Sequence, residues 1–317
     1  MNRSLFFIAV LSAGLTVAAG DKSINENVDA DGRTQLEISH GHGNITVQGW
    51  DQDRVSLSGT ITTRGKWNKR LDDLDVEVTT SGNTVMVKVI KPQANWSGSG
   101  SYRIDYELKA PRGMSVNLSN SHGQTYITDF QGDVDLKTSH GNLEGSHFEG
   151  DLNLTANHGH AEIRDVGGRA NVQHNHGNLE LVDLNGDLDY KGNHGKAVLV
   201  NINGSIRLEN SHGKVDIDGV DGGVKGTINH SNLVVTTSTV PNGNYQLKAS
   251  HGNITLHFPE DTGMDLGLET RHGSISTNTS ISVEKERNAA SLRGKVRDGN
   301  VKVRLDANHG NVTVKTH

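Results

Sequence analysis

Seven histidines recur at one fixed interval in the middle of the chain. They are His122, His140, His158, His176, His194, His212 and His230. Gly follows six of them, Ser231 follows the seventh, and a Ser or Asn precedes every one. A period that holds over six intervals without slippage is the signature of a repeat architecture. We refer to these seven residues as the histidine ladder.

Each 18-residue unit divides into two halves of equal length, and Gly recurs once in each half at the same offset. In the unit 176–193 the apolar positions include Leu179, Leu181 and Leu188, and the next unit repeats these offsets. Alternation of apolar and polar residues over so short a run predicts a strand with one buried face. The glycines mark the bends between strands. No segment of the mature chain shows a sustained helical period, so we expect essentially no helix.

We therefore predict an all-β fold built around a β-solenoid of 18-residue coils, with two strands in each coil. Successive coils are expected to stack at ~4.8 Å, the ordinary spacing of paired strands. The predicted divisions are an export signal over 1–20, an irregular strand-rich N-terminal region over 21–118, regular coils over 119–235, and irregular coils with a cap over 236–317. A hydrophobic fraction of 32% suggests disorder in a globular chain, but a solenoid needs only a thin apolar stripe in each coil.

The N-terminal segment 1–20 has the composition of a secretory signal. Arg3 supplies the positive end, residues 5–17 the apolar core, and residues 17–19 a small-residue cleavage site. The apolar run is too short to span a membrane, and Asp21 stands close to where a lipoprotein needs Cys. We expect an exported protein without a membrane span, in the periplasm or at the surface of a bacterial cell. A net charge of −6 with no basic face argues against a nucleic-acid partner.

Several short motifs together resemble one bacterial family. They are GNITVQGW at 43–50, YELKAPRG at 106–113, LHFP at 256–259 and ETRHGSI at 269–275. Their order makes residues 35–317 similar to the DUF4097 family of "putative adhesins". The resemblance implies an exported strand-repeat protein of the cell envelope, and it carries over no catalytic residue. This chain departs from the family pattern by having His before the turn Gly, where relatives usually have Ser or Thr.

Alternation along the strand predicts that the histidine ladder faces outward. Leu179 and Leu181 face the core, so Asn178, Glu180 and His176 face solvent, and the same holds for each coil. Seven imidazoles then stand in one column at ~4.8 Å spacing. Protonated neighbours repel one another, so we expect pKa values below the free value within this column. The Ser and Asn residues one position earlier are expected to form a hydrogen-bonded ladder along the bend.

Three interpretations of the histidine ladder stay open. Repeat duplication copies any residue at a corner, whether or not it has a function. Neutral imidazoles also bind divalent metals, here Zn, Cu or Ni, and we expect no other cofactor. The best local set for a metal, on outward faces of successive coils, is His158, His160, His174 and His176. In the third interpretation the column becomes positive below about pH 6 and holds acidic polysaccharide or lipopolysaccharide.

The sequence offers little support for an enzyme. It contains no nucleophile elbow, zincin or P-loop motif. The outward acids Glu144, Glu162, Glu180 and Asp216 are scattered among Asn and Lys. We predict a non-enzymatic, adhesin-like protein that presents a flat repetitive face to an envelope polysaccharide or another cell-surface ligand, with its oligomeric state left open. A polysaccharide-active β-helix enzyme is the remaining alternative, which two close carboxylates in a cleft would favour.

Overall fold

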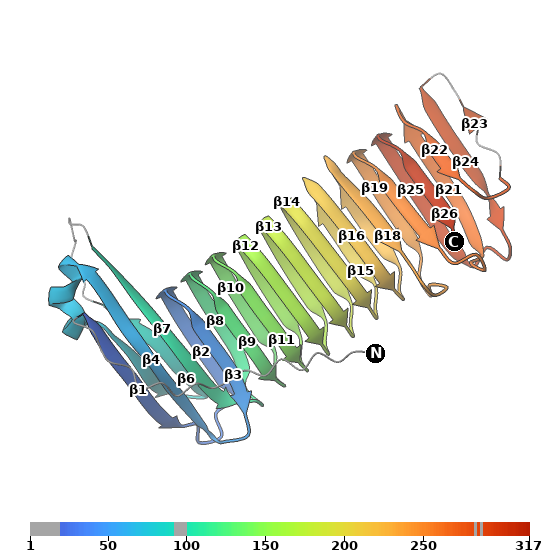
Figure 1. The fold of residues 1–317 in the computed structure, drawn as a ribbon. Helices are drawn as coiled ribbons and strands as arrows, with labels where there is room; N and C mark the ends of the chain where they lie inside the picture. The colour runs from blue at the N-terminus through green and yellow to red at the C-terminus, as the bar shows by residue number, and fades with distance from the viewer. Residues whose placement is uncertain (1–19, 92–99, 282–283, 286–287) are drawn as a thin grey trace.

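The computed structural model describes residues 20–91, 100–281, 284–285 and 288–317. Most of this chain is β-strand, stacked in one elongated array from the blue N-terminal end to the red C-terminal end (Figure 1). The all-β, strand-rich part of the prediction is therefore confirmed. The predicted export signal lies outside the described residues, except for Gly20. Within the described part of the chain, no helix has the length and apolar character needed to cross a membrane.

The central strands pair in parallel with the strand at the equivalent position of the next turn: Val134 lies beside Leu152, and Leu152 beside Ala170. These strands are β8 (Ser115–His122), β9 (Thr125–Phe130), β10 (Val134–His140), β11 (Leu143–Phe148), β12 (Leu152–Val166), β13 (Ala170–Leu184), β14 (Leu188–Ile202), β15 (Ile206–Asn210), β16 (Gly213–Val220), β17 (Val224–Ile228) and β18 (Ser231–Thr236). Each turn of chain contributes two strand segments, and β12, β13 and β14 each run through both segments of their turn.

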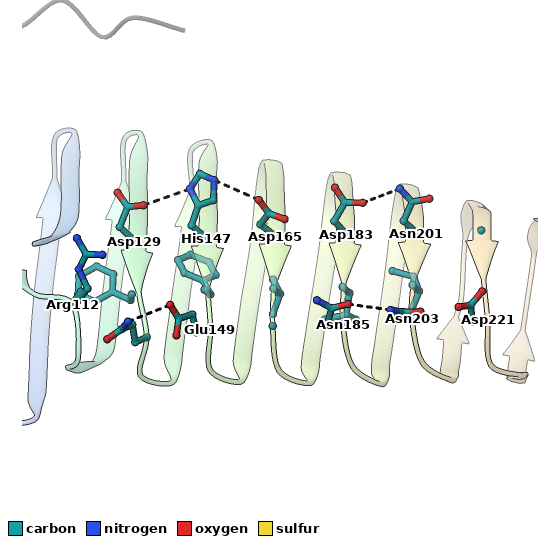
Figure 2. A pocket seen from close by; sticks show the side chains of 18 of the residues that line it. Arg112, Asp129, His147, Glu149, Asp165, Asp183, Asn185, Asn201, Asn203 and Asp221 are labelled. Carbon is teal, nitrogen blue, oxygen red and sulfur yellow. Dashed lines mark hydrogen bonds and ion pairs between the residues drawn. The ribbon is translucent and has the colours of Figure 1, made fainter. Parts of the chain in front are cut away.

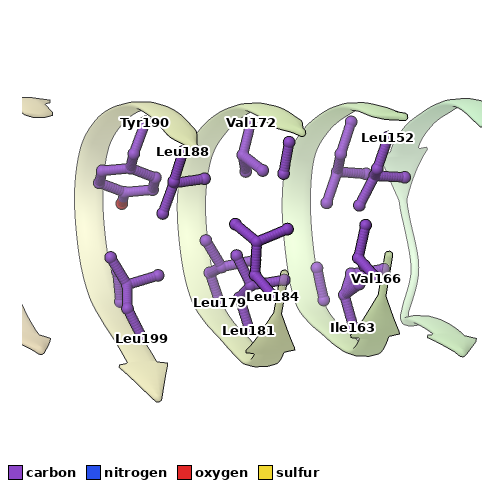
Figure 3. Close-up of a cluster of buried hydrophobic side chains, with 14 of the residues drawn as sticks. Leu152, Ile163, Val166, Val172, Leu179, Leu181, Leu184, Leu188, Tyr190 and Leu199 are labelled. Atoms are coloured by element: carbon purple, nitrogen blue, oxygen red, sulfur yellow. The ribbon is translucent and has the colours of Figure 1, made fainter. Parts of the chain in front are cut away.

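Apolar side chains from the two segments of each turn meet between them and form the core (Figure 3). Leu179 and Leu181 on one side are at most 1% exposed, and they face Val172 and Leu188 from the other side. Because a single turn cannot bury its own apolar stripe, the stacking of turns stabilises the fold.

Irregular strands close the N-terminal end of the array. They are β1 (Asp21–Asp29), β2 (Gln35–His42), β3 (Ile45–Trp50), β4 (Arg54–Gly65), β5 (Asp75–Ser81), β6 (Thr84–Ile90) and β7 (Gly100–Pro111). Strands β2 and β3 join the parallel array beside β8 and β9, and the antiparallel pairs β1–β4, β4–β7 and β5–β6 cover the end. A 3-10 helix, η1 (Lys66–Asp73), follows β4. In the described part of the chain it is the single helical segment, which agrees with the expectation of essentially no helix.

At the C-terminal end the order of strands in space departs from their order in the chain. These strands are β19 (Tyr245–His251), β20 (Ile254–Phe258), β21 (Met264–Arg271), β22 (Ile275–Thr277), β23 (Glu284–Lys285), β24 (Ala289–Val296), β25 (Val301–His309) and β26 (Val312–Thr316). Strand β25 lies between β19 and β21, and β26 lies between β20 and β22. The last two strands are thus inserted into the stack, while β24 covers its end by antiparallel pairing with β21.

Candidate functional site

Ring-to-ring contacts join a set of histidines into a single stack along one edge of the molecule. In spatial order they are His42, His122, His140, His158, His176, His194, His212, His230, His251, His309 and His272. Adjacent ring centroids are 4.4–5.3 Å apart, and after the first pair all rings lie within 8° of parallel to their neighbours. All eleven residues are exposed. We call this set the histidine column.

The histidine ladder forms the middle of the column, and sequence analysis missed its four outer members. Each of the four is followed by Gly, as at His42-Gly43, so the local signal was present. Irregular spacing hid them. The interval from His230 to His251 is longer than the regular period, and the neighbour of His251 on the other side, His309, comes from a strand near the end of the chain.

Backbone crowding explains why Gly follows His at this corner. At Gly141 the φ angle is 141°, and a Cβ atom there would lie 1.9 Å from the carbonyl oxygen of Gly123 in the preceding turn. The same clash recurs between Gly177 and Gly159, so no L side chain fits where the turns stack this closely. His176 itself lies in the left-handed region, with φ of 54°.

Asn side chains two positions after the histidines tie successive turns together. The Oδ1 atom of Asn142 accepts a hydrogen bond from the backbone N–H of His160 at 3.2 Å, and other turns repeat this contact. The sequence predicts a hydrogen-bonded ladder on the other side, one position before the histidines. There the structure has a hydrogen bond from Asn175 to Asn157, at 3.1 Å. Together these contacts hold the corner, and therefore the rings, in register.

His174 does not share an outward face with His158, His160 and His176. Its side chain is 2% exposed and lies in the core. The outward placement predicted for it is wrong because strand alternation does not continue through the His–Gly bend, where Gly177 has a φ angle of 144°, so residues 174 and 176 fall on opposite faces. Nε2 of His160 lies 3.7 Å from a carboxylate oxygen of Glu162. Among the described residues, no group of three or more His, Asp or Glu is arranged to hold a metal ion.

At three positions of the column the surroundings disfavour the protonated imidazole. Desolvation, followed by the charges of His194 and His230, lowers the pKa of His212. Desolvation and then the neighbouring rings of the column also lower the pKa of His309 and of His42. Each proton added to the stack therefore makes the next one harder to add.

The other bend of each turn carries a groove of about 730 Å³ that runs along the stack (Figure 2). One wall is a row of residues in the left-handed region that recur at equivalent positions of successive turns: Asp129, His147, Asp165, Asp183 and Asn201. His147 lies between Asp129 and Asp165, with nitrogen–oxygen distances of 3.5 and 3.4 Å. Asn201 donates a hydrogen bond to Asp183 at 2.8 Å. Phe148 and Leu184 are among the residues that line the groove.

Eight carboxylates follow this bend and define what we call the acidic edge. They are Asp129, Asp133, Glu149, Asp151, Asp165, Asp183, Asp187 and Asp221. Two arginines lie there as well: Arg112 is paired with Asp51 at 2.8 Å, and Arg169 with Asp151 at 3.2 Å. Sequence analysis did not single out this edge, although its acids and amides recur with the same period as the histidines.

The model of the Toastrack DUF4097 family matches residues 15–315. No curated protein matches the chain. A solved "putative cell adhesion protein" from Clostridium sporogenes is 12% identical, with 94% of this chain and 100% of that chain covered and a TM-score of 0.25. A "putative adhesin" from Bacteroides fragilis is 12% identical, with 93% and 97% covered and a TM-score of 0.34. A "putative lipid binding protein" from Parabacteroides distasonis is 11% identical, with 94% and 97% covered and a TM-score of 0.31. These TM-scores are too low to support an argument, and the family match alone confirms the resemblance predicted from the sequence.

Proposed function

The chain belongs to the Toastrack DUF4097 family, and on that premise we propose that it is an exported, non-enzymatic envelope protein of adhesin type. In this proposal a rigid β-solenoid presents one repeated surface to a partner that repeats along its own length. The histidine column carries the proposal, because it offers eleven exposed rings at nearly one spacing. An extended ligand bound along such a surface makes many equivalent contacts at once, which multiplies weak individual affinities.

Protonation of the column selects the class of ligand. At neutral pH most imidazoles carry no charge, whereas below about pH 6 they become a line of positive charge along one edge. An acidic polysaccharide or a lipopolysaccharide carries anionic groups at intervals along an extended surface and complements that line. Because the contact is made by exposed charges, we expect its affinity to fall steeply with added salt.

Binding to immobilised polygalacturonate at about pH 7.5 and about pH 5.5 tests this proposal. We expect retention only at the lower pH, and its loss in about 0.5 M NaCl. The variant carrying His158→Asn, His176→Asn and His194→Asn should lose most retention, because it interrupts the centre of the column. The control His147→Asn places the same substitution at the opposite bend and should bind normally. Unchanged retention of the triple variant would contradict the proposal.

Divalent metal binding by Zn, Cu or Ni is the second candidate, and the number of exposed imidazoles favours it. In parallel stacked rings, equivalent nitrogens are as far apart as the centroids, 4.4–5.3 Å. Two nitrogens bound to one Zn²⁺ at ~2.1 Å each are at most ~4.2 Å apart. A shared ion therefore requires neighbouring rings, such as His158 and His176, to turn out of the stack. Isothermal titration calorimetry with Zn²⁺ tests this candidate. A saturable heat of binding at about pH 7.5 that disappears at about pH 5.5 would support it, and no heat of binding at either pH would overturn it.

We assign no catalytic role to the groove at the acidic edge. Its carboxylates are engaged by side chains of neighbouring turns, as His147 engages Asp129 and Asp165, and such contacts stabilise a stack. The alternative is a polysaccharide-active β-helix enzyme. Such an enzyme would release new reducing ends from polygalacturonate. If Asp165→Asn abolished this release and Glu144→Gln on the flat sheet face kept it, the enzyme activity would replace the proposed binding role.

A further inference from the structure

The two bends of each turn carry surfaces of opposite potential charge. The His–Gly bend ends the first strand segment, as at His140 between β10 and β11. The acidic bend ends the second segment, as at Glu149 between β11 and β12. Because the two segments lie on opposite sides of the core, the two bends form opposite edges of the stack, roughly 20 Å apart for strands of about six residues.

The two edges also share one period. Parallel pairing of equivalent positions in successive turns advances the histidines and the acids by the same one strand spacing per turn. A line of imidazoles on one molecule and a line of carboxylates on another therefore share one spacing and stay in register along the stack.

We propose that the protonated histidine column of one molecule docks on the acidic edge of a second copy of this chain. The contact is heterologous, since each molecule offers one surface of each kind, and its repetition produces an open row of rods lying side by side. This inference goes beyond binding of an envelope ligand and shares only the column with it.

Groups around the column do not cancel its charge. The titratable and charged side chains there include the buried His40 and His174 and also Lys91, Tyr102, Asp105, His160, Glu162, Lys196, Lys214, Asp216 and Arg271. The three carboxylates in this set are each already paired with a Lys or Arg at 2.6–2.8 Å. Positive charge gained by the column is therefore left for a partner to neutralise.

The acidic edge carries charge in excess of its own cations. Arg112 is held by Asp51, outside the eight carboxylates, and Arg169 neutralises only Asp151. Asp165, Asp183 and Asp187 are exposed. His147 also lies in the groove, between Asp129 and Asp165. If its imidazole were protonated, it would offset part of the negative charge of these two carboxylates.

Association requires imidazolium and carboxylate at the same pH. Asp and Glu side chains ordinarily titrate near pH 4, and imidazoles near pH 6.5. Docking places carboxylates beside the rings, which raises the pKa of the rings, so association takes up protons and strengthens as the pH falls. Below about pH 4 the acids lose their charge and the contact weakens. We therefore expect a maximum between about pH 4 and pH 6.

Sedimentation velocity of the purified chain across about pH 7.5, 5 and 3.5 tests the proposal. We expect monomer at the highest pH, a weight-average mass at least about twice that of the monomer at pH 5, and dissociation at pH 3.5 or in about 0.5 M NaCl. Monomer at all three pH values would overturn it. Association at pH 5 that EDTA abolishes would overturn it as well, because metal ions would then be the bridge.

Two variants, each altered on only one of the two surfaces, test whether the histidine column of one molecule contacts the acidic edge of another. A column variant carries His158→Asn, His176→Asn and His194→Asn, and an edge variant carries Asp165→Asn, Asp183→Asn and Asp187→Asn. Each alone should stay monomeric at pH 5, whereas an equal mixture should form heterodimers, because one supplies intact acids and the other intact histidines. A control with Glu144→Gln and Glu180→Gln on the sheet face should associate as the unmodified chain does.

Native circular dichroism at pH 7.5 verifies that each variant folds. Failure of the mixture to associate, when both variants are folded, would overturn the proposal. Polygalacturonate binding is measured separately. If the unmodified chain binds polygalacturonate but does not self-associate, this inference is refuted and the proposed function is left intact. The reverse result would refute the proposed function alone.

Discussion

Acid should destabilise the N-terminal end of the stack through one buried histidine, His40. Its side chain is 4% exposed, and its ring meets Tyr106 edge-on with centroids 5.1 Å apart. Burial lowers the pKa of His40 to about 4 from an ordinary value of 6.5, against a smaller opposing effect of Asp105. The folded protein therefore excludes a proton that the unfolded chain accepts.

Stability falls as the pH drops through the window between these two values, because the unfolded chain binds more protons there. The full difference corresponds to about 3 kcal/mol, of which about 2 kcal/mol is lost by pH 5. Replacing His40 with Leu removes the titrating group and keeps an apolar side chain of similar size in the core.

Urea unfolding followed by tryptophan fluorescence measures this difference, since the Trp67 ring lies 4.9 Å from that of Tyr102 in the same region. Between about pH 7.5 and pH 5, the unmodified chain should lose about 2 kcal/mol more than His40→Leu. The control His317→Leu removes an exposed histidine and should behave as the unmodified chain does. Equal pH dependence of the unmodified chain and His40→Leu would refute the reasoning.

Two further substitutions test the stacking of turns. Gly177→Ala should lower the free energy of unfolding by at least ~2 kcal/mol, because a Cβ would lie 1.9 Å from the Gly159 carbonyl oxygen at a φ of 144°. Gly113→Ala, where a Cβ meets nothing within 4 Å, should change it by less than ~0.5 kcal/mol in the same urea titration; equal effects would contradict the close approach. Leu181→Ala should lower the free energy of unfolding by ~2–5 kcal/mol, and Val182→Ala, at the half-buried neighbouring position, should lower it much less. Equal losses of thermal stability would contradict the assignment of Leu181 to the core face.

The strict 18-residue repeat is the basis of most of what the sequence predicts about the fold. A repeat without slippage allows one register, and the structure pairs Val134 with Leu152 and Ala170 with Leu188 accordingly. Recurrence also locates the histidine ladder, because residues at equivalent positions of stacked turns must lie above one another.

Prediction failed where the backbone leaves regular strand geometry or where distant segments meet. The side of His174 could not be read from alternation, because alternation does not continue through the bend at Gly177, whose φ angle is 144°. The place of His309 beside His251 depends on insertion of β25 into the stack, and no local pattern reports which distant strand pairs with it. At the acidic edge, Asp129 or Asp183 taken singly is an ordinary bend residue, so only comparison of turns reveals the row.

A titration of the histidine ring signals by NMR, from about pH 8 to pH 4, tests most directly whether the column acts as one unit. Stacked rings that share charge should titrate over a broad range with pKa values below 6.5 for His212 and His309. In His194→Asn, removal of a neighbouring charge should raise the pKa of His212 and leave that of the distant His309 unchanged. Independent curves near the ordinary value, unaltered by His194→Asn, would contradict a coupled column.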